Sequence, residues 1–342
     1  MRLGLGLIVG AALAVGGCVE RKESILVTPG RVDIRVEHHT KQQVDLRNHD
    51  AAPSIRGGWL VEERSELEDQ QNPDADRIFY LVADASFPIQ GPLPSSFAEA
   101  GEADADVYLQ FPTRVKIEQR RDGTYYHFSR RYEGRLWAEF EAHEKAMKES
   151  LKDFKDAKPE QLTHENRVTI VHAFVDLEIY KKLLFARRAF ADLGEHAGAA
   201  PQDAWLAARA SVLAIPNELD YDALARMIES DDEDPEKEKL IDAEAKALEA
   251  RIERALDESL RDAGLPGAML AQFTQRFHRH HRYHQVTEDL NDDNFKISIE
   301  MPGHVVGSNA DQFSGGKAVW KFAGSDLHDR DAELFITSRV AR

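Results

Sequence analysis

Hydrophobic and polar residues alternate with a period of two near both ends of the chain, which predicts β-strands there. The pattern is clearest where Val32, Ile34 and Val36 are separated by charged residues. It also flanks Asp122 and Gly123, a pair typical of the tight turn between two hairpin strands. The predicted strand regions are 31–39, 77–87, 113–134, 295–301, 317–322 and 332–340.

The middle of the chain has a different period. Apolar residues recur there at spacings of three and four, as on amphipathic helices. The second of these helices carries two apolar stripes, so we expect neighbours to cover it on two sides. The predicted helices cover residues 136–154, 160–194, 201–214, 220–230 and 235–263, with a last helix around 269–285.

Predicted strands near both chain ends with predicted helices between them indicate an α+β fold. The C-terminal strands are too few and too short to be stable alone, because a small sheet has exposed edges and an uncovered apolar face. We therefore expect an antiparallel β domain with a single sheet built from both chain ends, residues 25–135 and 291–342. Residues 136–290 are expected to be an inserted antiparallel helical bundle or coiled-coil hairpin.

The first residues have the composition of a secretory signal. Arg2 precedes an apolar stretch, residues 3–17, that is shorter than the roughly 20 residues of a membrane-spanning helix. The stretch ends in Gly16 and Gly17, followed by Cys18, the single cysteine of the chain. This resembles the lipobox of bacterial lipoproteins. The resemblance implies that residues 1–17 are removed and that Cys18 is acylated, with residues 18–24 as a linker.

The same resemblance implies a location in the cell. An Asp directly after the acylated cysteine favours retention in the inner membrane of Gram-negative bacteria, and this chain has Val19 there. We therefore expect a lipid-anchored protein of the cell envelope, on the periplasmic face of the outer membrane. The acylated Cys18 would be its contact with the membrane.

The C-terminal strands carry a second, short resemblance. Residues 301–340 contain Ser308-Asn309-Ala310-Asp311, a glycine turn, a strand with Trp320 and Lys321, and a last strand with Ser338. This pattern is similar to the strand module of LppM-like envelope lipoproteins. The helical middle of the chain has no counterpart in that pattern.

Charge excludes one class of partner. The chain carries 44 basic and 61 acidic residues, a net charge of −17. A strongly anionic protein is repelled by phosphate backbones, so no nucleic acid is expected as a partner. The densest acidic run, residues 229–238, reads as a solvated loop or as a docking segment for a basic partner.

A histidine cluster at residues 278–284 is one candidate metal site. His280 and His284 are spaced to lie on one face of a helix, next to His281, and neutral imidazoles at that spacing bind metal ions. The arginines between these histidines oppose a bound cation. A polar helix end that packs against acidic neighbours is the alternative.

Residues 289–300 are a second candidate. Asp289, Asn291, Asp293 and Glu300 match positions 1, 3, 5 and 12 of a calcium loop. The match is incomplete, because position 6 is Asn294 instead of Gly and a strand follows the loop instead of a helix. The alternative is a polar turn that leads into the strand.

No nucleophile motif or phosphate-binding loop is present in the sequence. We therefore predict a non-catalytic binding or assembly module of the cell envelope, with an envelope protein as the expected partner and no cofactor. The alternative is a metal-dependent hydrolase that uses the histidines of residues 278–284.

Overall fold

The computed structural model describes residues 18–47, 50–72, 75–154, 157, 161–194, 201–228, 235–314 and 316–342. The expected signal peptide, residues 1–17, lies outside this range. The described residues form two compact units. One is helical and contains residues 138–282, and the other contains residues 18–137 and 283–342. We call them the helical unit and the β unit.

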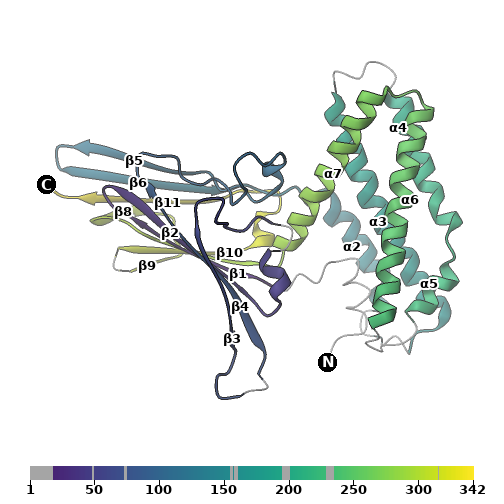
Figure 1. Ribbon diagram of the computed structural model, residues 1–342, viewed down its shortest axis with the longest axis horizontal. Helices are drawn as coiled ribbons and strands as arrows, with labels where there is room; N and C mark the ends of the chain where they lie inside the picture. The colour runs from purple at the N-terminus through teal and green to yellow at the C-terminus, as the bar shows by residue number, and fades with distance from the viewer. Residues whose placement is uncertain are drawn as a thin grey trace. The chain divides into compact units, whose positions relative to one another are not determined.

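The first sheet of the β unit has seven strands in the order β3-β4-β2-β1-β7-β10-β9 (Figure 1). The first four strands along the chain and three later strands build it, so both chain ends contribute. Its strands are β1 (Glu20–Val27), β2 (Arg31–Thr40), β3 (Leu60–Leu67), β4 (Arg77–Pro88), β7 (Asn294–Glu300), β9 (Gln312–Ser314) and β10 (Lys317–Ala323).

The second sheet has four strands in the order β5-β6-β11-β8. The predicted turn at Asp122 and Gly123 joins β5 to β6, which confirms the hairpin. This sheet also combines strands from both chain ends, so the β unit has two sheets instead of the single sheet expected. Its strands are β5 (Thr113–Arg120), β6 (Gly123–Tyr132), β8 (His304–Ser308) and β11 (Ala332–Val340).

The α+β fold and the origin of its strands in both chain ends are confirmed. One pairing is not antiparallel, because β1 lies parallel to β7. These two strands come from opposite ends of the chain, so no hairpin turn constrains their direction.

The core of the β unit lies between the two sheets. Val32, Ile34 and Val36 of β2 are buried there, as the alternation predicts. The ring of Tyr132 from β6 crosses the interface and lies 5.2 Å from that of Phe322 on β10, centroid to centroid. Aliphatic and aromatic side chains from both sheets therefore form one continuous core.

Residues 18–24 do not form the linker that we expected. β1 begins at Glu20, and it pairs with β2 and β7 from that residue onward. The sequence conceals this strand because its inward positions are the charged residues Arg21 and Glu23, which are 8% and 4% exposed. Both charges have partners in the interior, Asp50 and Asp293 for Arg21 and Arg130 for Glu23.

Six α-helices are assigned in the described residues. Thr163 caps α3 by accepting a hydrogen bond from the Asn166 backbone N–H, and α3 buries apolar residues on more than one side, as its two stripes predict. The helices are α2 (Ala138–Ser150), α3 (His164–Leu193), α4 (Pro201–Ala214), α5 (Tyr221–Met227), α6 (Pro235–Asp262) and α7 (Gly267–Leu290).

Helix α7 belongs to both units. Its residues up to Arg282 belong to the helical unit, whereas the last eight, from Tyr283, belong to the β unit. Val286 and Leu290 are 0% and 1% exposed in the β core. The helical excursion thus ends before the residue 290 that we expected, because helical periodicity does not reveal which core a helix face contacts.

In the described part of the chain, no helix has the length and apolar character needed to cross a membrane.

Candidate functional site

Cys18 lies directly at the beginning of the seven-stranded sheet. Its thiol is exposed and accepts a hydrogen bond from the side-chain amide of Asn294, with a distance of 3.1 Å between nitrogen and sulfur. The next residue, Val19, is already bound to the sheet, because its carbonyl accepts from the backbone N–H of Asn294 at 3.1 Å. Partial burial raises the pKa of the Cys18 thiol, which keeps it protonated at neutral pH.

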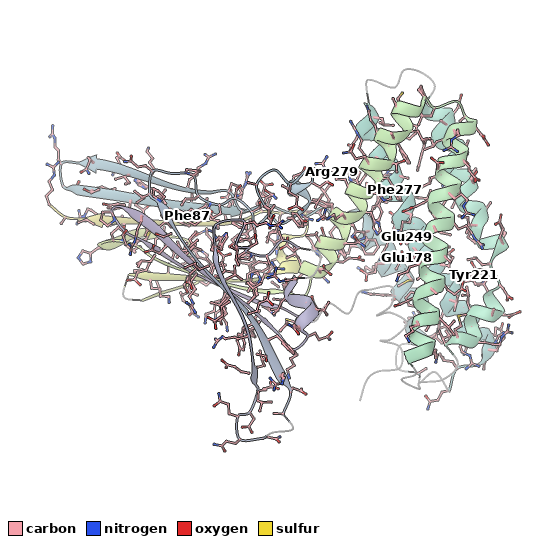
Figure 2. All side chains as sticks on the ribbon, viewed as in Figure 1. Phe87, Glu178, Tyr221, Glu249, Phe277 and Arg279 are labelled. Carbon is pink, nitrogen blue, oxygen red and sulfur yellow. The ribbon has the colours of Figure 1, made fainter. Side chains whose placement is uncertain are left out.

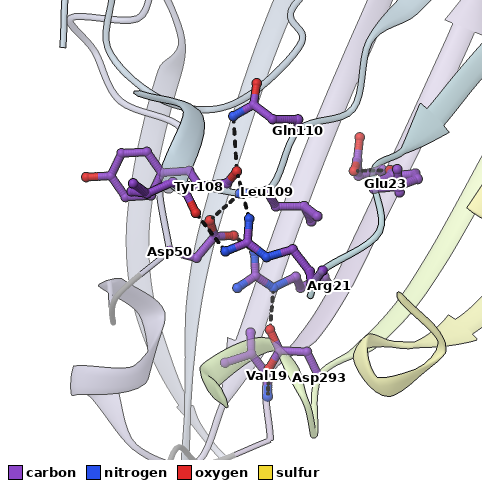
Figure 3. Close-up of polar contacts among 11 residues, drawn as sticks. Val19, Arg21, Glu23, Asp50, Tyr108, Leu109, Gln110 and Asp293 are labelled. Atoms are coloured by element: carbon purple, nitrogen blue, oxygen red, sulfur yellow. Dashed lines mark hydrogen bonds and ion pairs between the residues drawn. The ribbon is translucent and has the colours of Figure 1, made fainter. Parts of the chain in front are cut away.

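A buried polar cluster surrounds Arg21, the second residue of β1 and two residues after Val19 (Figure 3). The guanidinium donates to Asp293 at 2.5 Å and to Asp50 at 2.7 Å. Asp293 also accepts the Val19 backbone N–H at 3.0 Å, and Asp50 accepts that of Leu109 at 3.1 Å. Arg21 and its two carboxylates therefore connect the start of β1 to the beginning of β7 and to the loop before β5.

The electrostatics of this cluster reflect its burial. Burial by itself lowers the pKa of Arg21, but Asp293 and Asp50 outweigh it, so the guanidinium stays charged. Burial raises the pKa of Asp293 to about 6, although Arg21 and the Val19 N–H oppose the rise. His38 is also buried nearby, and burial lowers its pKa well below its usual value, so it is neutral.

We expect a specific pH dependence from Asp293. The folded protein holds the Asp293 proton more tightly than the unfolded chain, so the contribution of this group to stability is present below about pH 4 and is lost as the pH rises to about 6. Its slope approaches roughly 1.4 kcal/mol per pH unit inside that window. Urea unfolding at several pH values should show this slope in the native chain and not in Asp293→Asn. Equal slopes in the two proteins would exclude the assignment.

A second buried cluster connects the two sheets. Glu23 of β1 accepts from the Arg130 guanidinium at 2.5 Å and from the Tyr132 hydroxyl at 2.7 Å, and both donors are on β6. The side chain of Arg130 is 0% exposed, and its guanidinium lies 4.9 Å from the Phe111 ring centroid. The contacts of Glu23 thus fix which residues of the two sheets face each other.

Sequence inspection did not identify either cluster. Their members come from segments far apart in the chain, and no local spacing connects them. The one local signal is the charged start of β1, and charged residues there are equally typical of a linker. Each charge has a buried partner on another segment of the chain. Both clusters therefore hold separate segments of the β unit together.

The predicted calcium ligands are not gathered around one point. Asp289 and Asp293 are both buried and line the small cavity at Arg21. Glu300 lies at the other end of β7. A strand rises about 3.3 Å per residue, which places Glu300 roughly 23 Å from Asp293 along the backbone. Asn291 contributes its backbone carbonyl to Ser325 N–H. Arg21 therefore occupies the position next to Asp293 where the loop hypothesis would place a cation.

The predicted histidine ligands also take separate partners. His280 contacts Asp192 at 2.8 Å, between ring nitrogen and carboxylate oxygen. His284 lies in the β unit, where its ring meets that of Trp137 edge-on with centroids 5.3 Å apart. His278 lies 3.8 Å from Glu253 at the helical surface.

His281 belongs to a charged group inside the helical unit. It lies 3.1 Å from the ammonium of Lys182 and 3.4 Å from Glu249, which is labelled in Figure 2. Lys182 is buried and ion-paired with Glu249. Burial and Lys182 lower the pKa of His281 to about 4, so the ring is neutral at pH 7. Across the described residues, no group of three or more His, Cys, Asp or Glu side chains could hold a metal ion.

A shallow groove of about 400 Å³ lies on the outer face of the seven-stranded sheet. Two of its charged side chains, Arg35 and Asp84, pair across β2 and β4 at 3.1 Å. Leu26 and Leu60 give it exposed apolar surface. The groove therefore combines charged and apolar side chains.

No protein-family model and no curated protein matches the chain. Among solved structures, the NMR structure of the folded domain of LppM from Mycobacterium tuberculosis matches with a TM-score of 0.27 and 9% identity, over 95% of this chain and 92% of that one. Similarity this low establishes neither a common fold nor a common function.

Proposed function

We propose that this chain is a lipid-anchored protein of the cell envelope, acylated at Cys18, whose β unit acts as a non-catalytic binding or assembly module. One observation carries the proposal. The single cysteine follows an apolar segment and two glycines in the sequence, and it lies exposed two residues before β1, the first strand of the sheet. A thiol in that place is accessible for modification while the fold behind it is complete.

The contacts after Cys18 add a structural consequence. Val19 is hydrogen-bonded on both sides, to Asp293 and to Asn294, so no flexible tether separates the modified residue from the sheet. An acylated Cys18 would hold this end of the β unit close to the lipid headgroups. Location on the periplasmic face of the outer membrane, which Val19 suggests by resemblance, is part of the proposal.

A non-catalytic role is favoured because the buried charges form ion pairs that join parts of the β unit. Arg21, Glu23 and Arg130 are each engaged by partners that join strands. The histidines considered for a hydrolase are engaged separately, so no observation favours that alternative.

The proposal predicts that Cys18→Ala abolishes metabolic labelling with a fatty acid, because the acyl acceptor is gone. The matched control is Asn294→Ala, which removes the amide that donates to the thiol but keeps the thiol itself. Labelling should persist in that control. Labelling that survives in Cys18→Ala would refute the anchor.

A further inference from the structure

Among the described residues, no strand pairs with the outer edge of β5 in the four-stranded sheet. β5 (Thr113–Arg120) is the outermost strand, with β6 as its one neighbour in the sheet order (Figure 1). Its register with β6 is regular along its whole length, without a bulge. A long, regular edge strand presents unpaired backbone N–H and C=O groups that a further strand could use.

The two sides of β5 differ in chemistry. Val115 and Ile117 point toward the core and remain partly exposed at its rim. Arg114 and Lys116 lie on the opposite, exposed side. Neither of these two side chains forms an ion pair or a hydrogen bond in the part of the chain that the structure describes, although the backbone of both residues pairs with β6.

The remaining charges of the strand are engaged. Arg120 and Glu118 pair with each other at 3.0 Å, and the Arg120 guanidinium lies 4.3 Å from the Tyr125 ring centroid. The Arg114 and Lys116 side chains thus lie together on one side of β5 in a chain with a net charge of −17, and Lys116 has only a through-space attraction to Glu118. They leave a local positive strip along an edge that can accept hydrogen bonds and donate them.

We propose that the β5 edge binds an extended acidic segment of a partner protein by strand addition. Main-chain hydrogen bonds would supply affinity and alternate side chains would supply specificity. The segment would place carboxylates beside Arg114 and Lys116, and aliphatic side chains beside Val115 and Ile117. This inference names the partner chemistry of the binding module proposed above, and so it rests on that proposed function.

Charge complementarity distinguishes this partner from two others. A second copy of β5 would bring together two strands whose exposed sides each carry Arg114, Lys116 and Arg120 against the single anion Glu118, and this net positive charge on both disfavours pairing between copies. An anionic bilayer would use the cations but not the backbone edge or the partly exposed Val115 and Ile117. An acidic strand uses all three features.

The test uses two short fluorescent peptides, one alternating Glu with Val or Ile and one alternating Lys with the same residues. The acidic peptide should bind the native chain and protect the amides of residues 113–120 from hydrogen exchange. Arg114→Glu/Lys116→Glu should weaken that binding about tenfold and favour the Lys peptide instead. The control Lys317→Glu/Lys321→Glu has the same change in charge on β10, an interior strand, and should behave as the native chain does.

The inference is overturned if the acidic peptide does not bind, if its binding ignores the Arg114→Glu/Lys116→Glu reversal, or if protection maps outside β5. It is also overturned if that reversal abolishes binding to anionic phospholipid vesicles while the peptide leaves β5 unprotected. The measurements are made both on chain purified from membranes and on Cys18→Ala. Equal peptide binding by the two separates this inference from acylation.

Discussion

Replacing Glu23 by Leu is expected to lower the free energy of unfolding of the β unit by about 3–5 kcal/mol. The substitution removes the one anion that compensates Arg130, whose side chain is 0% exposed. A buried guanidinium without a counter-ion is costly, because the interior does not replace its lost hydration. Urea unfolding followed by tryptophan fluorescence measures the loss. A Trp205→Phe background restricts the signal to the tryptophans of the β unit, Trp59, Trp137 and Trp320.

The control replaces the whole cluster. Glu23→Leu combined with Arg130→Met and Tyr132→Phe removes both charges of this cluster together with the Tyr132 hydroxyl that donates to Glu23. Buried ion pairs exchanged for apolar residues of similar volume are often neutral or stabilising, so the triple variant should recover most of the loss. A single variant that loses less than about 1 kcal/mol, or a triple variant no more stable than the single one, would contradict the account.

Excision of the helical unit is expected to leave a folded β unit, provided that the end of α7 is kept. Residues 138–282 would be replaced by a short Gly/Ser linker. The residues on either side of the excised segment lie close together. Leu136 N–H donates to the Tyr283 hydroxyl at 3.2 Å, and Arg135 donates to the Tyr283 carbonyl at 2.8 Å. Closing such a short loop costs little entropy. The product should be soluble, β-rich by circular dichroism, and cooperative in urea.

Extending the excision to residue 290 is the matched comparison, and it should abolish cooperative folding. It removes Val286 and Leu290 from the core, each worth about 1.5–3 kcal/mol as a buried side chain. It also removes Thr287, whose hydroxyl accepts from buried Arg135 at 3.0 Å. Two excisions that fold equally well would show that the end of α7 is not part of the β core.

Periodicity predicted the fold where each element shows its apolar face in the sequence. Val32, Ile34 and Val36 alternate with charges and point into the core, and helix α4 begins and ends where its pattern does. The start of β1 was not predicted, because two of its inward positions, Arg21 and Glu23, are charged. Their burial depends on partners supplied from other parts of the chain, and a local pattern cannot show those partners.

The sequence spacing of the candidate metal ligands has a related weakness as a predictor of a site. Spacing alone made Asp289, Asp293 and Glu300 look like one loop, but a straight strand carries Glu300 away from the other two. The histidines share one helix, yet each meets a different neighbour. A site needs convergence in space, and neither sequence pattern specified which side chains would converge.

The central claim is that Cys18, two residues before β1, carries the membrane anchor of the β unit. Mass spectrometry of the N-terminal peptide, from chain purified out of membranes, tests it most directly. The account predicts a peptide that begins at Cys18 and carries the mass of acyl chains on that residue. A peptide that retains the Gly17–Cys18 bond, with an unmodified Cys18 thiol, would contradict it.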